Sequence, residues 1–123
     1  MVLTNGQNNG IPSASGTDGE GIAGRTSVGL SSDGTCLFLL TIDGLEGASP
    51  QYGATFYDVG EWLIRVGAYN GITLDGGGST AMAMMNARHE AVLVNVPHDV
   101  EGANGPPYLQ RANAQFLGVI PGS

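Results

Sequence analysis

The sequence contains no lysine, a single cysteine and no long apolar run, and each scarcity excludes a class of function. Its four cations are arginines, set against eleven carboxylates. Binding to a nucleic-acid polymer needs clustered cations that displace counterions, so we expect neither that partner nor an anionic membrane surface. The lone Cys36 excludes an internal disulfide. No stretch approaches the ~18 apolar residues of a membrane span, and we expect no signal peptide in this chain.

Glycine, in contrast, is abundant, at 21 of 123 residues. The glycines show no Gly-X-Y period, which excludes collagen. Residues of the apolar classes make up 41 % of the chain, enough for one domain with one modest core. Residues 1–24 are rich in Gly, Asn, Ser and Thr and predict a flexible arm, followed by a folded domain over residues 25–123.

The rest of the chain alternates short apolar runs with turn signals. Strands are predicted at residues 25–31, 36–43, 72–75, 81–86, 91–96 and 112–120. Because residues 36–42 are apolar on both faces, we expect a central strand that is covered on both sides. A capping signal at Thr55 and a stop at Gly67 bound a predicted helix. This order predicts an α+β fold with a mostly antiparallel β-sheet and one main α-helix packed on a face.

The most distinctive local feature is LDGGGST, residues 74–80. A carboxylate at a strand end is followed by three glycines, which would let a ligand reach main-chain N–H groups, and then by two hydroxyls. A tight turn in which Asp75 caps local amides is the alternative. No lysine follows, so this is not a Walker loop, and the glycine spacing differs from that of the dinucleotide fingerprint.

A second carboxylate, Asp43, also ends a predicted strand. If the two strands are neighbours, Asp43 and Asp75 converge at one sheet edge, as paired carboxylates do in glycosidases; two ordinary Asp-Gly turns are the alternative. Arg25 and Arg111 each precede a strand, where they would either hold a phosphate or lie paired on the surface. We expect no cofactor; two carboxylates are a thin case for Ca²⁺ or Mg²⁺, which stay open.

Taken in order, four runs resemble the phosphodiester glycosidase domain over about residues 25–120: RTSVGLSSDGTCLFLLTIDG, GATFYDVGEWLIRVGAYNGI, TLDGGGST and QRANAQFLGVI. The resemblance implies a hydrolase that cleaves the glycosidic bond of a sugar-1-phosphodiester or of a related glycosyl-phosphate or nucleotide-sugar. It implies catalytic carboxylates at Asp75, first, and Asp43, second. With the glycine-rich run, the candidate substrate and phosphate contacts are Arg25, Thr26, Gly76, Gly77, Gly78, Ser79, Thr80, Arg111 and Asn113.

The chain departs from the family at its start, where members usually carry a further N-terminal segment. We therefore expect the C-terminal portion of the family domain, with residues 4–8 as a remnant of that segment. A homo-oligomer, or association with the missing segment, would then cover the strand at 36–42. The expected ligand is a small phosphorylated sugar or nucleotide. Alternatives are a non-catalytic binding module for a phosphorylated sugar or cyclic nucleotide, and a phage or envelope structural protein; the family's members are bacterial and phage proteins, often exported.

Overall fold

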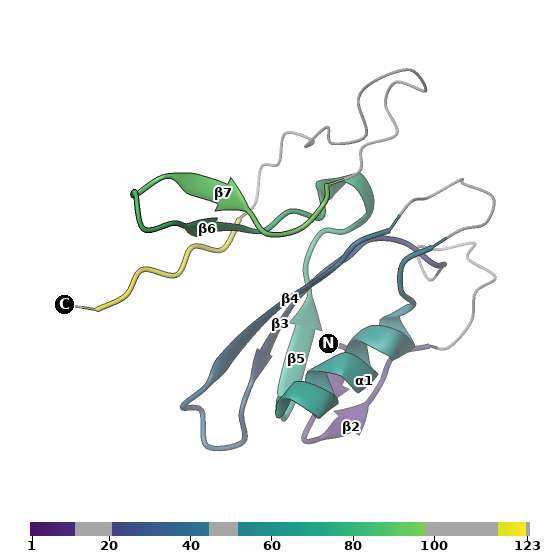
Figure 1. Ribbon diagram of the computed structural model, residues 1–123. Helices are drawn as coiled ribbons and strands as arrows, with labels where there is room; N and C mark the ends of the chain where they lie inside the picture. The colour runs from purple at the N-terminus through teal and green to yellow at the C-terminus, as the bar shows by residue number, and fades with distance from the viewer. Residues whose placement is uncertain (12–20, 45–51, 98–115, 123) are drawn as a thin grey trace.

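The computed structural model describes residues 1–11, 21–44, 52–97 and 116–122. A five-stranded sheet in the order β2-β1-β5-β3-β4 carries one helix, α1, on one face, and a separate two-stranded sheet pairs β6 with β7 (Figure 1). All the pairings among the described strands are antiparallel. The predicted fold class is confirmed: α+β, with a mostly antiparallel sheet and one main helix.

The elements follow one another in short steps along the chain. The larger sheet consists of β1 (Leu3–Thr4), β2 (Gln7–Asn8), β3 (Arg25–Leu30), β4 (Leu37–Ile42) and β5 (Asn70–Thr73). The helix α1 spans Phe56–Val66, and a short 3-10 helix, η1, spans Gly77–Ser79. The smaller sheet is a hairpin of β6 (Ala83–Met85) and β7 (Ala91–Leu93). No helix in these described ranges has the length and apolarity needed to cross a membrane.

Helix α1 begins and ends where its local signals predict. Thr55 Oγ1 accepts a hydrogen bond from Asp58 N, at 3.2 Å, and Asp58 Oδ2 accepts one from Thr55 N, at 2.9 Å. This reciprocal pair is a capping box, which satisfies two N–H groups that the helix leaves unpaired. Gly67 ends the helix in the left-handed conformation, with φ of 100°.

The core lies between α1 and the sheet. Val59 and Leu63 of the helix are fully buried, and Leu3 of β1 is buried with them. Gly71 of β5 makes this approach feasible, because a Cβ there would lie 2.5 Å from Leu63 Cδ1. Apolar residues of β4 on the same face, Phe38 among them, pack against this cluster.

The prediction of a flexible arm over residues 1–24 is wrong for the first eleven residues. Val2 and Leu3 belong to the core, and β1 pairs with both β2 and β5. Asn5 and Gly6 have φ of 50° and 75°, as the two central residues of a type I′ hairpin turn require. Strands of two residues are too short to show a period, so the Asn-Gly pair was the usable signal.

The expectation that residues 36–42 form a central, doubly covered strand is also wrong. β4 is an edge strand of the described sheet, and Leu37 and Leu39 on the face away from α1 are 49 % and 43 % exposed. Of the predicted last strand, residues 112–115 lie outside the described residues and residues 116–120 form no strand. The other predicted strands are present, with shorter or shifted bounds.

The sheet face turned away from α1 is apolar and open. Its exposed large side chains include Leu30, Leu37, Leu39, Ile72 and Leu74. Figure 1 shows the β6–β7 hairpin set apart from α1, with the five-stranded sheet between them. All six strand residues of this hairpin are exposed.

Candidate functional site

The candidate carboxylates both lie at the sheet edge where β3 begins. β3 runs antiparallel to β4 and to β5, with Arg25 opposite Ile42 and Ser27 opposite Thr73. The neighbours of β3 therefore end at the same end of the sheet. Asp43 directly follows β4, and Asp75 follows β5 after one residue, Leu74. The two strands are not neighbours, because β3 lies between them, so their ends are two strand spacings, or ~10 Å, apart.

Three backbone segments touch at this edge, around Gly24. Gly77 N donates a hydrogen bond to Gly24 O, at 2.8 Å. A Cβ on Gly76 would lie 2.7 Å from Gly24 O, and one on Gly44 would lie 2.3 Å from Gly24 N. At the second position of each Asp-Gly pair only glycine fits, because the main chain of Gly24 comes so close. This close approach places each aspartate near the start of β3.

Most main-chain N–H groups of the glycine-rich run donate hydrogen bonds to acceptors within the chain. Gly77 has φ of 58° and opens η1. Ser79 N donates to Gly76 O, and Thr80 N donates to Gly77 O. Together with the Gly77 bond to Gly24, these contacts correspond to the tight-turn alternative raised from the sequence. Phosphate contacts of Gly76, Gly77 and Gly78 stay a prediction.

Asp75 is exposed at the start of this run. Its Oδ1 accepts a hydrogen bond from Gly76 N, at 3.0 Å, which is the capping contact expected of an aspartate in an Asp-Gly turn. The exposed carboxylate is accessible to a ligand or to water.

Asp43 is held more firmly, by the segment that follows β7. Its Oδ1 accepts a hydrogen bond from Asn95 Nδ2 at 2.8 Å, and Val96 N lies 3.1 Å from Oδ2 and 3.2 Å from Oδ1. Asn95 Nδ2 also donates to Thr80 O, at 3.1 Å. Sequence analysis missed Asn95; the available signal was a lone polar residue inside the apolar run AVLVNV.

Two of the candidate phosphate contacts carry buried hydroxyls without a hydrogen-bond partner in the described part of the chain. They are Thr26 Oγ1 and Thr80 Oγ1; Ser27 Oγ is the third such atom. Thr80 is 2 % exposed, and its Oγ1 would lie 3.0 Å from a Cβ on Gly24. Burying a hydroxyl without a partner costs about 1–3 kcal/mol, so each has the capacity to gain from an added acceptor. Ser79 is buried beside Thr80.

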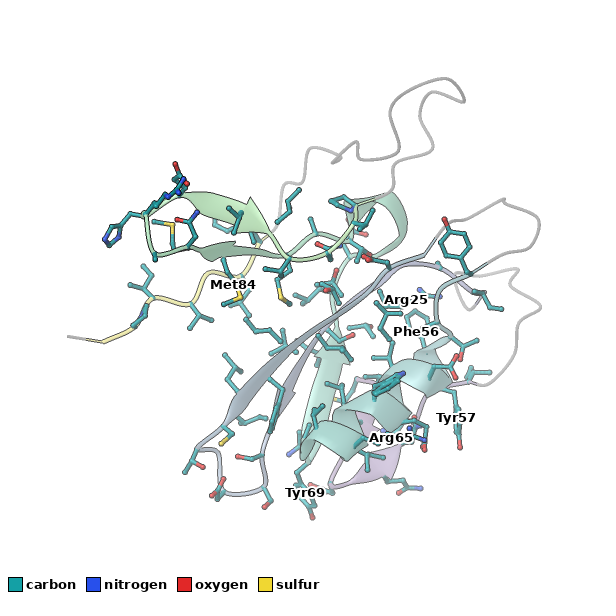
Figure 2. All side chains as sticks on the ribbon, viewed as in Figure 1. Arg25, Phe56, Tyr57, Arg65, Tyr69 and Met84 are labelled. Carbon is teal, nitrogen blue, oxygen red and sulfur yellow. The ribbon has the colours of Figure 1, made fainter. Side chains whose placement is uncertain are left out.

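Arg25 is directed toward α1 (Figure 2). Only 7 % of the residue is exposed, and its guanidinium carbon lies 4.1 Å from the centroid of the Phe56 ring. Nε donates to Ala54 O at 2.9 Å, and Nη2 donates to Gly21 O. These contacts tie the start of β3 to the segment before the helix. A phosphate contact of Arg25 stays a prediction.

Two further predicted site residues, Arg111 and Asn113, lie outside the described residues. Among the residues described, no three His, Cys, Asp or Glu side chains gather as a metal site would need.

Comparisons with known proteins identify the family. None of the curated proteins matches the chain. Among solved structures, it is similar to a hypothetical protein from Synechocystis, with 21 % identity and a TM-score of 0.46, over 65 % of this chain and 15 % of that one. The chain thus spans a small part of that protein's length. A family model described as phosphodiester glycosidase matches residues 1–120, beginning well before the boundary at residue 25 that the sequence suggested. By this match over nearly all of its length, the chain belongs to the phosphodiester glycosidase family.

Proposed function

We propose that this chain contributes the reacting carboxylates of a hydrolase that cleaves the glycosidic bond of a sugar-1-phosphodiester or of a related glycosyl-phosphate or nucleotide-sugar. Family membership supports the reaction class. The observation that carries the proposal is the position of Asp43 and Asp75, which flank the start of β3 at one sheet edge beside the glycine-rich run.

The two carboxylates suit different tasks. Cleavage at an anomeric carbon passes through an oxocarbenium-like transition state, which a carboxylate stabilises or to which it directs an activated water. Asp75 is exposed and takes this role first. Asp43 is fixed by Asn95 and Val96 and serves as the second, oriented charge. The phosphate leaves readily, so the site has to bind it more than to protonate it.

Hydroxyl groups are the proposed phosphate donors with the clearest support. Thr26 and Thr80 carry buried hydroxyls that lack partners in the described residues. The other proposed contacts are Arg25, Gly76, Gly77, Gly78, Ser79, Arg111 and Asn113. No metal takes part in the proposed reaction, so we expect EDTA to leave the turnover unchanged.

Turnover of a panel of sugar-1-phosphodiesters and nucleotide-sugars by the full chain tests this proposal, with the released sugar measured. We expect Asp75→Asn to lower kcat by about 10²- to 10⁴-fold, and Asp43→Asn by less. Glu90→Gln is the matched control, because Glu90 is an exposed carboxylate in the hairpin turn that also accepts an amide hydrogen bond. Thermal melting of each variant confirms that it folds.

Each outcome decides between the hypotheses. Full turnover by Asp75→Asn and Asp43→Asn would remove the carboxylate assignment. Tight binding of a panel member without product would replace the hydrolase with a binding module for a phosphorylated sugar or cyclic nucleotide. Neither binding nor turnover would overturn both and leave a structural protein that reuses the fold.

The open sheet face motivates a proposal about assembly. Its exposed leucines would be covered in a homo-oligomer or by a further N-terminal segment of the family domain. Light scattering on the chain measures its mass in solution; a monodisperse monomer would contradict the homo-oligomer.

A further inference from the structure

Asn95 uses its side-chain amide to join three segments of the chain. Nδ2 donates to Asp43 Oδ1, at 2.8 Å, and to Thr80 O, at 3.1 Å, while Oδ1 accepts from Met82 N, at 2.7 Å. A carboxylate and a carbonyl oxygen can only accept, and a main-chain N–H can only donate. The amide therefore has one orientation that satisfies all three partners, and its side chain is fixed.

These contacts set the direction of the Asp43 carboxylate. One oxygen of Asp43 receives the Asn95 amide, and Val96 N donates to the same carboxylate. Through Thr80, the same amide group is tied to the end of the glycine-rich run whose start carries Asp75. Asn95 thus links the surroundings of one candidate carboxylate to those of the other.

The segment directly after β7, residues 95–97, carries hydrogen bonds to the end of β4 and a buried proline. The strands β6 and β7 pack mainly against each other, and their side chains are exposed. The next residue, Pro97, is fully buried, and the hydrogen bonds of Asn95 and Val96 set how the segment before it meets the end of β4.

We propose that Asn95 is a positioning residue for Asp43, a role that rests on the proposed hydrolase function. It holds the carboxylate toward the anomeric carbon without itself touching the substrate. Misplacing a reacting group by about 1 Å costs about 10²-fold in rate, which sets the size of the expected effect.

The test is Asn95→Asp, which keeps the side-chain shape and the acceptor for Met82 N but replaces the amide donor with a carboxylate. Near neutral pH we expect kcat to fall by about 10- to 100-fold, with KM changed less than threefold. As the pH falls, the introduced carboxyl gains a proton that it can donate to Asp43, so the ratio of variant to wild-type kcat should rise. A purely structural defect would leave that ratio constant.

Asn86→Asp is the matched control, because Asn86 lies in the same hairpin and its Nδ2 also donates to a carboxylate, Glu90 Oε2, at 2.9 Å. We expect this variant to keep the wild-type kcat and pH profile. A kcat ratio for Asn95→Asp that stays at one, or is low but constant with pH, would overturn the positioning role.

A second measurement separates this proposal from the proposed function. The ¹³C signal of the Asp43 carboxyl, followed by NMR during a pH titration, should change with Asn95→Asp and stay unchanged with Asn86→Asp. If the wild type turns over no substrate but this NMR difference is present, the hydrolase function fails and the positioning of Asp43 stands. An unchanged Asp43 titration in Asn95→Asp would overturn the positioning itself.

Discussion

The two sides of the five-stranded sheet are held in different ways. On the helix side, Val59 and Leu63 are fully buried and the helix is capped by reciprocal hydrogen bonds. On the other side, Leu37 and Leu39 are exposed and the β6–β7 hairpin is attached through polar contacts. The helix side therefore holds the main apolar cluster, while the direction of Asp43 depends on hydrogen bonds.

Truncating the helix side should produce the largest loss. Leu63→Ala removes a fully buried side chain of the core that faces Gly71 of β5, and we expect about 2–5 kcal/mol of destabilisation. Met84→Ala in the hairpin, where the side chain is 59 % exposed, should cost less than about 0.5 kcal/mol. Urea unfolding measures both losses. Equal losses of unfolding free energy would show that the helix side is no more important for stability than the hairpin.

Overfilling the same interface should cost less than emptying it. A Cβ on Gly71 would lie 2.5 Å from Leu63 Cδ1, so Gly71→Ala should destabilise the fold by about 1–3 kcal/mol. Gly118→Ala is the control, since a Cβ there meets nothing within 4 Å. The same unfolding measurement applies; a harmless Gly71→Ala would show that the helix can withdraw from the sheet without cost.

The capping box of α1 should contribute less to stability than the packing of the helix on the sheet. Thr55→Ala removes the side-chain acceptor of Asp58 N, and we expect about 1 kcal/mol of destabilisation. A double-mutant cycle with Asp58→Ala should show that the two losses are not additive, because each residue caps the other. Additive losses would mean that the two hydrogen bonds act independently.

The smallest effect should come from the turn between β3 and β4. Ser31 Oγ donates to Asp33 Oδ1, and Thr35 adds its main-chain N–H and its hydroxyl, which together lower the pKa of Asp33 from 3.8 to about 2. A lowered pKa in the folded state means that ionised Asp33 stabilises the fold above about pH 4, and that this contribution is lost as the pH falls toward 2.

The measurement is the melting temperature of the wild type and of Asp33→Asn across that range. The difference between them should narrow from pH 5 to pH 2, because Asp33 is increasingly protonated over this range and so, like the asparagine, loses its charge. A difference that stays constant would show that the charge of Asp33 contributes nothing to stability.

Local signals predicted those parts of the fold that depend on local contacts. Thr55, Asp58 and Gly67 set the ends of α1, and all three are readable within one or two turns of helix. The position of β4 at the edge of the sheet was not predictable in this way. An apolar run shows which residues a strand could bury, but not which strands lie beside it.

The residues of the candidate site likewise fall into those that the sequence predicted and those that it did not. The sequence predicted Asp43 and Asp75 at one end of the sheet only if their strands were neighbours. The strands are instead separated by β3, and their ends lie together because both run antiparallel to it. Asn95 was missed because its partners come from two other segments, which only the folded chain brings together. The buried position of Arg25 against Phe56 was likewise invisible in the sequence.

The crossing of main chains at Gly24 also bears on the order of folding. Gly24 meets Gly44 and Gly77, which are remote along the chain, through main-chain contacts. The helix, in contrast, is held on the sheet by the buried cluster of Leu3, Val59 and Leu63, so this end of the sheet should assemble after the helix has docked. In hydrogen exchange, the amide of Gly77 should therefore lose its protection before that of Ala68, which donates to Leu63 O at the end of the helix. The end of the sheet that carries the candidate site would then be the last part of the molecule to form and the first to open.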